Sequence, residues 1–375
     1  MIQLNRIFSD GMVLQGGREN RVWGEADGAS VTLHIQGKAV TAPVIDGRFS
    51  AWLPILDYGD GFTLEIRGTE TLLIRDVAVG EVWLCGGQSN MEFQLRFDRD
   101  FASRQPGAWD IRCFGVAQIA DPEALSRFDY SQWDFWRRGD TMENLSHFTA
   151  VGYYAAVELA RKTGHTIGLI NCSWGATAAL PWLDPATIQN TPAKQWIEEY
   201  EAGTCEKTPE QLREEYLENP PSNRGRLFDD TFNNRLLYGI GPQEQEALMR
   251  GMPAAVFTMP YQDAPGILYR NMLLRVAPYG IKGVFWYQGE TDTIHPELYG
   301  DMLSGVINTW RGAWEEELPF FVVQLTSFEH WLMIDGEQYP QLRDMQEQVA
   351  DALPGVYLIS TMDCGMRWDL HAKGK

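Results

Sequence analysis

The stretch that decides the fold is GEVWLCGGQSNME, residues 80–92. It starts as an apolar run typical of a buried strand and ends in two glycines, where the chain has to turn. Four more apolar runs follow, and helical stretches separate them: residues 166–171, 283–287, 320–324 and 356–360. Apolar strands that alternate with helices predict an α/β protein with a parallel sheet whose two faces are covered by helices.

The segments outside these strands complete the predicted organisation. Apolar residues at helical spacing predict helices over residues 151–162, 298–314 and 342–352. Residues 1–76 differ, because short alternating runs such as 30–35 and 62–66 are separated by Gly and Asp turns. We therefore expect an N-terminal β-sandwich-like domain over 1–76 and an α/β domain over 77–375.

One segment interrupts the pattern of the α/β domain. Residues 190–265 lack the alternation of strands and helices, and residues 198–218 are rich in Glu and Lys. We expect 190–265 to be an insertion whose charged part is a surface helix or loop. A lid over the functional site is one interpretation of it.

The charge of the chain limits its partners. With 51 acidic and 31 basic residues, the formal net charge is −20. Such a chain repels phosphate backbones and anionic membrane surfaces, so we expect neither nucleic acid nor membrane as a partner. An acidic sugar would need a local arginine. The 14 Trp, 14 Tyr and 17 Phe suit stacking on sugar rings, although most of them are expected to fill the core. The composition does not predict the oligomeric state.

The cysteines and the N-terminus give no sign of a secreted or metal-binding protein. Five cysteines are scattered without a CxxC pair, which predicts neither a disulfide framework nor a metal site. They are Cys85, Cys113, Cys172, Cys205 and Cys364. Cys85 and Cys172 lie in apolar runs and are expected to be buried free thiols. The first residues lack an apolar segment and no run has the length of a membrane span, so we expect a cytoplasmic protein.

Ser89 is the first candidate for chemistry. It follows Gly86 and Gly87 at the predicted turn from strand to helix, where a hydroxyl is exposed and the serine N–H can stabilise an oxyanion. The structural alternative is a serine that caps the helix, and the local sequence favours neither reading.

Asp369 and His371 form the second candidate. A nucleophilic serine needs a base, and the base needs an acid that fixes its tautomer. In an extended segment, residues two apart point the same way, so Asp369 can reach one nitrogen of His371 and leave the other for Ser89. This is the one histidine of six with an aspartate at that offset after a late strand.

Two further motifs follow strands and should reach the same edge of the sheet. In Ser173-Trp174-Gly175, Gly175 can offer a backbone N–H to an oxyanion, and in Gln288-Gly289-Glu290 the Gln288 amide can do the same. For Glu290 and Asp292, we favour a structural role in which buried carboxylates hold loops by accepting backbone N–H groups.

Gly-Gln-Ser-Asn-Met-Glu, Ser-Trp-Gly, Trp-Tyr-Gln-Gly-Glu and Asp-Leu-His, in this order, resemble the sialate O-acetylesterase family and the related acetylxylan esterases. The resemblance implies an SGNH, flavodoxin-like fold, a three-layer α/β/α arrangement around a parallel sheet. It implies catalysis by Ser89, Asp369 and His371, and oxyanion donors from Ser89, Gly175 and Gln288. No metal or other cofactor is implied.

The expected activity is therefore removal of acetyl groups from a sugar through an acyl-serine intermediate. We expect the substrate to contact residues within the same motifs: Gln88, Asn90, Trp174 and Glu290. Two alternatives stay open: an esterase for acetylated xylan or another polysaccharide, and a catalytically weak carbohydrate-binding protein with the same fold.

Overall fold

The computed structural model describes residues 1–98, 100–218, 260–331, 334–365 and 371, and at 330–331 and 334–335 the backbone alone. Its central sheet has the strand order β10-β9-β11-β8-β12-β13-β16. All neighbours in this order are parallel except β10, which is antiparallel to β9. The strands are β10 (Trp136–Arg138), β9 (Ile111–Gly115), β11 (Ile167–Ser173), β8 (Thr71–Gly87), β12 (Gly283–Tyr287), β13 (Phe320–Val323) and β16 (Val356–Ile359).

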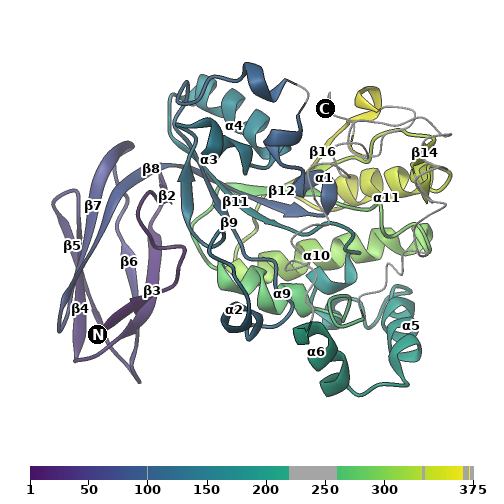
Figure 1. Ribbon diagram of the computed structural model, residues 1–375, viewed down its shortest axis with the longest axis horizontal. Helices are drawn as coiled ribbons and strands as arrows, with labels where there is room; N and C mark the ends of the chain where they lie inside the picture. Colours follow the sequence, from purple (N-terminus) through teal and green to yellow (C-terminus); the bar gives the residue numbers. More distant parts are fainter. Residues whose placement is uncertain (99, 219–259, 332–333, 366–370, 372–375) are drawn as a thin grey trace.

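Helices lie on both sides of this sheet, so the predicted α/β class is confirmed. In Figure 1, α4 (Ala150–Thr163) lies on one side of β11 and α10 (Tyr299–Trp314) on the other. The third predicted helix is α11 (Tyr339–Ala352), which packs on α10 and β16. Local sequence sets the ends of α4: the Thr149 hydroxyl accepts the Gly152 N–H, and Gly164 ends the helix in the left-handed conformation.

Strands β9 and β10 were not predicted, and a buried charge explains why β9 was missed. Arg112 lies in the middle of β9 and is fully buried. Its guanidinium pairs with Asp76 and Asp110 and donates to the Gly11 carbonyl oxygen. A charged residue breaks the apolar run on which a strand prediction rests, whereas the folded chain neutralises it with the adjacent Asp110 and with Asp76 from the preceding strand.

The N-terminal segment is all β, as predicted. One sheet has the order β1 (Ile2–Leu4), β3 (Asn20–Ala26), β6 (Arg48–Leu53). The other strands connect to the first half of β8: β2 (Val13–Gln15) and β7 (Gly59–Arg67) pair with it, and β4 (Ser30–Ile35) pairs with β7 and β5 (Lys38–Pro43). Strand β8 runs on without a break into the central sheet, so the expected boundary at 76/77 falls inside a single strand.

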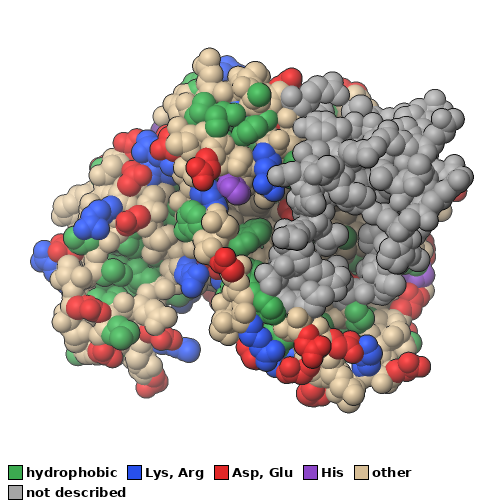
Figure 2. Space-filling model, in the orientation of Figure 1, with side chains coloured by type: hydrophobic (Ala, Val, Ile, Leu, Met, Phe, Trp, Pro, Cys, Tyr) green, Lys and Arg blue, Asp and Glu red, His purple; other side chains and the backbone are tan. Residues whose placement is uncertain are grey.

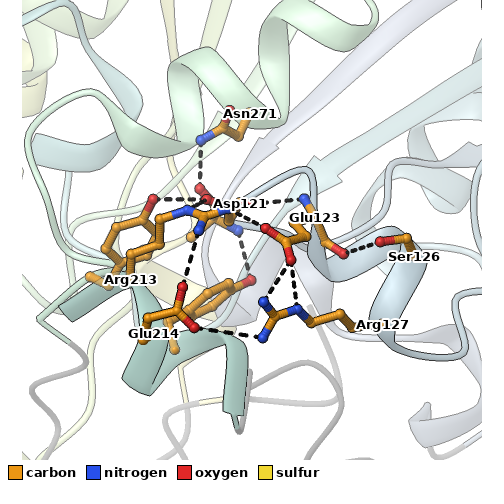
Figure 3. Close-up of polar contacts among 10 residues, drawn as sticks. Asp121, Glu123, Ser126, Arg127, Arg213, Glu214 and Asn271 are labelled. Carbon is orange, nitrogen blue, oxygen red and sulfur yellow. Dashed lines mark hydrogen bonds and ion pairs between the residues drawn. The ribbon is translucent and has the colours of Figure 1, made fainter. Parts of the chain in front are cut away.

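The start of the expected insertion is helical. It contains α5 (Lys194–Thr204) and α6 (Pro209–Glu218), and residues 219–259 lie outside the described part. Acidic side chains gather on the face of Figure 2 where these helices lie. Arg213 of α6 pairs with Asp121 and Glu123, and the Tyr261 hydroxyl donates to Asp121 (Figure 3). This cluster fixes α6 to the loop that follows β9.

Candidate functional site

The three glycine-containing motifs meet at one edge of the sheet, as predicted. Gly87, the last residue of β8, is in register with Ser173 of β11 on one side and Tyr287 of β12 on the other. The Trp174 N–H donates to the Gly87 carbonyl (3.0 Å), and the Gln88 N–H donates to the Tyr287 carbonyl (3.1 Å). This is the carboxyl edge of the parallel strands, where sites of open α/β sheets gather.

Gly87 makes the turn possible. Its φ is +137°, and a Cβ at this position would lie 2.0 Å from the Tyr287 carbonyl oxygen. An L-residue side chain is thus excluded both by the backbone conformation and by the space. The chain then enters α1 (Ser89–Glu92), which begins with Ser89 in a half-buried position.

Gly175 lies against Ser89, but its N–H has another partner. A Cβ built on Gly175 would be 3.4 Å from the Ser89 Cβ, so the two residues are in contact. The Gly175 N–H donates to the Glu92 carboxylate instead of pointing at an open oxyanion position. Burial raises the pKa of Glu92, and hydrogen bonds from Gln118 and Gly175 partly oppose this.

Glu92 and Gln118 are site residues that the sequence motifs did not single out. Glu92 follows Ser89 by three residues, which places both on neighbouring positions of a helix, and this spacing was the available signal. Gln118 comes from the loop after β9 and donates to the Ser173 carbonyl oxygen (3.0 Å). Together they anchor the Ser173–Gly175 segment.

The Gln288 amide is engaged inside the protein. It is fully buried, and its Nε2 donates to Asp292, to the Thr177 carbonyl (3.1 Å) and to the Gln88 Oε1 (3.2 Å). Its two N–H groups are thus shared among three acceptors, and the expected role as an oxyanion donor does not match this geometry. Instead, Gln288 supports Gln88, the residue before the serine.

Two further buried side chains, Tyr299 and Gln346, hold the backbone of Gln288. The Tyr299 hydroxyl donates to the Gln288 backbone carbonyl (2.7 Å), and the Gln346 Nε2 approaches the same oxygen (3.3 Å). The Gln346 Oε1 accepts the Leu325 N–H (3.0 Å). The turn before Ser89 is therefore held by a connected buried network, which fixes a single arrangement when its members are satisfied.

Asp292 lies at the end of this network, and its contacts match the structural role we favoured. It is fully buried, accepts the Ala179 N–H at 3.2 Å with both oxygens, and accepts from Gln288. Burial raises the pKa of Asp292 to about 7, against the opposing effect of these hydrogen bonds. Asp292 thus links the loop that follows β11 to the motif that follows β12.

Asp292→Asn should change how stability depends on pH. Because the folded-state pKa is raised, Asp292 favours the folded state at low pH, and this contribution is lost as pH rises from about 4 to about 7. Within that window, the stability of the wild type relative to Asp292→Asn should fall by roughly 1.4 kcal/mol per pH unit. Urea unfolding of both proteins at several pH values measures this difference. Parallel curves would show that Asp292 does not titrate in this range.

The four expected substrate-binding side chains are buried at the base of the turn. Gln88, Asn90, Trp174 and Glu290 are between 2% and 5% exposed. The Asn90 Nδ2 donates to the Glu290 Oε1 at 2.5 Å, and the Gln88 Oε1 accepts from Gln288. Their burial favours support of the turn before Ser89 over direct contact with a sugar.

His371, near the C-terminal end of the sequence, lies beside α1. It is buried, and its ring stacks on Phe93 with centroids 6.3 Å apart. Phe93 is the C-cap of α1, the helix that begins at Ser89. Asp369, the expected acid, lies outside the described residues.

Comparisons with known proteins show which family this chain resembles. The sequence model of the carbohydrate esterase family described as sialic acid-specific acetylesterase matches residues 257–374. Sialate O-acetylesterase of Mus musculus is 27% identical over 339 residues, which cover 82% of this chain and 57% of the relative. The Homo sapiens enzyme is 26% identical, with 91% of this chain and 61% of the relative covered. The chain thus spans about three fifths of the length of these relatives.

A solved structure extends the likeness to the fold. A carbohydrate acetylesterase from Xanthomonas citri superimposes with a TM-score of 0.73 and 26% identity, over 100% of this chain and 71% of that one. In the described part of this chain, no helix is long and apolar enough to cross a membrane. Family model, relatives and solved structure together show that this chain is similar to the sialate O-acetylesterase family.

Proposed function

We propose that this protein hydrolyses O-acetyl esters of a sugar, with Ser89 as the nucleophile. The observation that carries the proposal is the position of Ser89 at the carboxyl edge of the sheet, in contact with Gly175 and on the helix whose end stacks on His371. The printed names of the relatives, sialate O-acetylesterase and carbohydrate acetylesterase, support a sugar acetyl ester as the substrate.

The reaction needs two steps. In the first, His371 takes the proton of the Ser89 hydroxyl while its oxygen attacks the acetyl carbonyl carbon, and the resulting oxyanion collapses as the sugar oxygen leaves with the proton from His371. In the second, His371 activates a water that attacks the acetyl-serine, and acetate leaves as Ser89 regains its proton. Asp369 is proposed to orient His371.

Oxyanion stabilisation needs at least one N–H directed at the developing charge. We propose the Ser89 N–H for this role. The Gly175 N–H can contribute where Glu92 shares or releases it. We also propose that Ala176 is a further backbone donor, because it is exposed beside Gly175 and has a φ of +61°.

The finer assignment of the fold follows from the same resemblance. We propose that residues from 77 onward form an SGNH-type three-layer domain with an insertion at about 190–265, and that 1–76 form a β-sandwich-like domain. The parallel order of β9, β11, β8, β12, β13 and β16, with α4 and α10 on opposite sides, supports the first assignment.

Acetate release tests the function. The wild type is incubated with p-nitrophenyl acetate and then with a panel of acetylated sialic acids and acetylated xylan, and free acetate is measured. A fluorophosphonate probe should label Ser89, as mapped on the digested protein. Turnover of xylan in preference to sialic acid would favour the polysaccharide esterase. Specific binding of sugars without acetate release would favour the carbohydrate-binding alternative.

Glu92 should position the Gly175 turn. Glu92→Ala removes the acceptor of the Gly175 N–H, and we expect kcat on p-nitrophenyl acetate to fall about 10-fold or more, the scale of one buried hydrogen bond. Glu92→Gln keeps an oxygen acceptor and should restore most of the rate. A higher kcat in Glu92→Ala would instead mean that the carboxylate blocks an oxyanion donor.

A further inference from the structure

A cavity lies behind Glu92, at the carboxyl ends of β9 and β11. Its walls include Gly115, the last residue of β9, and Asn171 of β11. Its volume is about 80 Å³. Since one water takes up about 30 Å³ of the liquid, the cavity has room for a few waters or for one small organic ion.

Arg137 gives the cavity its charge. It lies in β10, lines the cavity and is only 8% exposed. Its Nη2 donates to the Gln132 carbonyl (2.6 Å) and side-chain oxygen (3.2 Å), and its guanidinium lies 4.1 Å from the centre of the Phe135 ring. These partners are all neutral. Among the residues that the structure describes, Arg137 has no carboxylate partner, and its Nε and Nη1 make no hydrogen bond.

Such an arginine is unusual in so acidic a chain. The other buried arginines of the described part pair with carboxylates, Arg112 with Asp76 and Arg311 with Glu317. A buried guanidinium without a counter-charge is costly, and burial lowers the pKa of Arg137. Because none of the 51 acidic residues is seen to neutralise it, a cation that faces a cavity in this way is suited to an anion from outside the chain.

The rest of the lining suits an anion that also has an apolar end. Cys113, Trp133 and Phe148 contribute apolar surface, and the Trp133 ring lies over Gly115, where an added Cβ would be 3.5 Å from it. His147 lines the cavity as well, and burial lowers its pKa, so its ring is neutral near pH 7. A carboxylate that carries one methyl group matches both the guanidinium and the apolar walls.

We propose that this cavity binds acetate, the product of the proposed reaction, and that the bound acetate inhibits the enzyme. Arg137 pairs with the acetate carboxylate, and Trp133 and Phe148 contact its methyl group. The inference rests on the proposed esterase function and adds to it an inhibitory site for the product that is separate from Ser89.

Glu92 connects this cavity to Ser89. It is the one acidic side chain among the described lining residues, and its carboxylate accepts the N–H of Gly175, which contacts Ser89. Two carboxylates in one cavity repel each other, and Glu92 relieves the repulsion by taking up a proton, because burial already raises its pKa. A neutral Glu92 is a weaker acceptor for the Gly175 N–H, so bound acetate loosens the turn beside the nucleophile.

The pattern of inhibition tests the separate site. Sodium acetate is added to the wild type during turnover of p-nitrophenyl acetate, with sodium chloride at the same concentration as the control for ionic strength. Because acetate in the cavity does not occupy the place of the substrate, it should lower kcat and leave KM within about twofold. Acetate that binds only at Ser89 competes with the substrate and raises KM alone. That pattern, or equal inhibition by chloride, would overturn the proposal.

Two neighbouring arginines form the matched pair of variants. Arg137→Gln should raise the inhibition constant of acetate roughly 10- to 100-fold, the range of a hydrogen bond between charged groups. Arg138 pairs with Asp110 and Asp76 and is much more exposed, so Arg138→Gln should keep the wild-type inhibition. The inhibition of each variant is measured against its own rate without acetate, and thermal unfolding shows whether it folds. Unchanged inhibition in a folded Arg137→Gln variant would refute the site.

Glu92→Gln tests the connection to Ser89. The amide keeps an oxygen acceptor for the Gly175 N–H but cannot take up a proton at this pH. This variant should therefore bind acetate at least as well as the wild type, and its kcat should fall much less when acetate is added. Inhibition of Glu92→Gln as strong as that of the wild type would refute Glu92 as the connecting residue.

A binding measurement separates this site from the esterase function. Titration with carbon-13-labelled acetate, followed by NMR, requires no turnover and should show binding that Arg137→Gln loses and Arg138→Gln keeps. Arg137-dependent binding without hydrolysis of any acetyl ester would contradict the esterase function and support the acetate site. Hydrolysis of acetyl esters without Arg137-dependent binding of acetate would refute the site and leave the esterase function in place.

Discussion

Ser89→Ala is expected to reduce kcat on acetyl esters by about 10⁴- to 10⁶-fold, because the acyl-enzyme can no longer form. The fold should be unaffected. Ser89 is half-buried at a turn that Gly87 and the buried glutamines hold in place, and the mutation leaves all of these contacts intact. Steady-state rates on p-nitrophenyl acetate measure the loss, and circular dichroism checks the fold.

Ser126→Ala is the matched control. Its hydroxyl donates to the Glu123 carbonyl in an exposed position of α2 (Ala124–Arg127), and the variant should keep full activity. A purified, folded Ser89→Ala protein with more than a few per cent of wild-type activity would contradict the assignment of the nucleophile.

His371→Ala is expected to be nearly as damaging, with kcat lowered by about 10³-fold or more, because the serine loses the base that accepts its proton. The buried ring of His371 on Phe93 places it by the helix of the nucleophile. The fluorophosphonate labelling of Ser89 should slow in parallel, which gives a second readout.

His165→Ala provides the comparison. His165 precedes β11 at the amino edge of the sheet and stacks on Tyr58, with ring centroids 3.8 Å apart. Its loss should leave kcat unchanged. We also expect Asp369→Asn to lower the rate far more than Asp363→Asn, since Asp363 lies in an exposed helical turn. The opposite order would mean that the acid is Asp363.

The sequence predicted the strand ends of the site well. Three apolar strands each finish in a glycine-containing motif, and parallel pairing brings their ends to one edge without further information. The register of Gly87 with Ser173 and Tyr287 confirms that expectation. The buried thiols of Cys85 and Cys172 were predicted for the same reason, since both lie within apolar runs.

The hydrogen-bond partners of the buried polar groups could not be predicted from the sequence. Whether the Gln288 amide points at a ligand or into the protein depends on its packing against Gln88 and Thr177, which are far from it in sequence. The same holds for the Gly175 N–H. The position of Glu92 three residues after Ser89 does not reveal that its carboxylate accepts this N–H. Arg112 shows the same limit for the fold, because its pairing with Asp76 and its burial appear only in the folded chain.

Strand β8 has a consequence for folding. Its first half pairs with the N-terminal strands β2 and β7. Its second half lies between β11 and β12 in the central sheet, so one continuous strand belongs to both parts. Removing residues 1–76 would cut through that strand and strip Val77, Ala78 and Val79 of the neighbours that bury them. Because one strand serves both sheets, we expect unfolding of the N-terminal strands to loosen the edge of the sheet that carries Ser89.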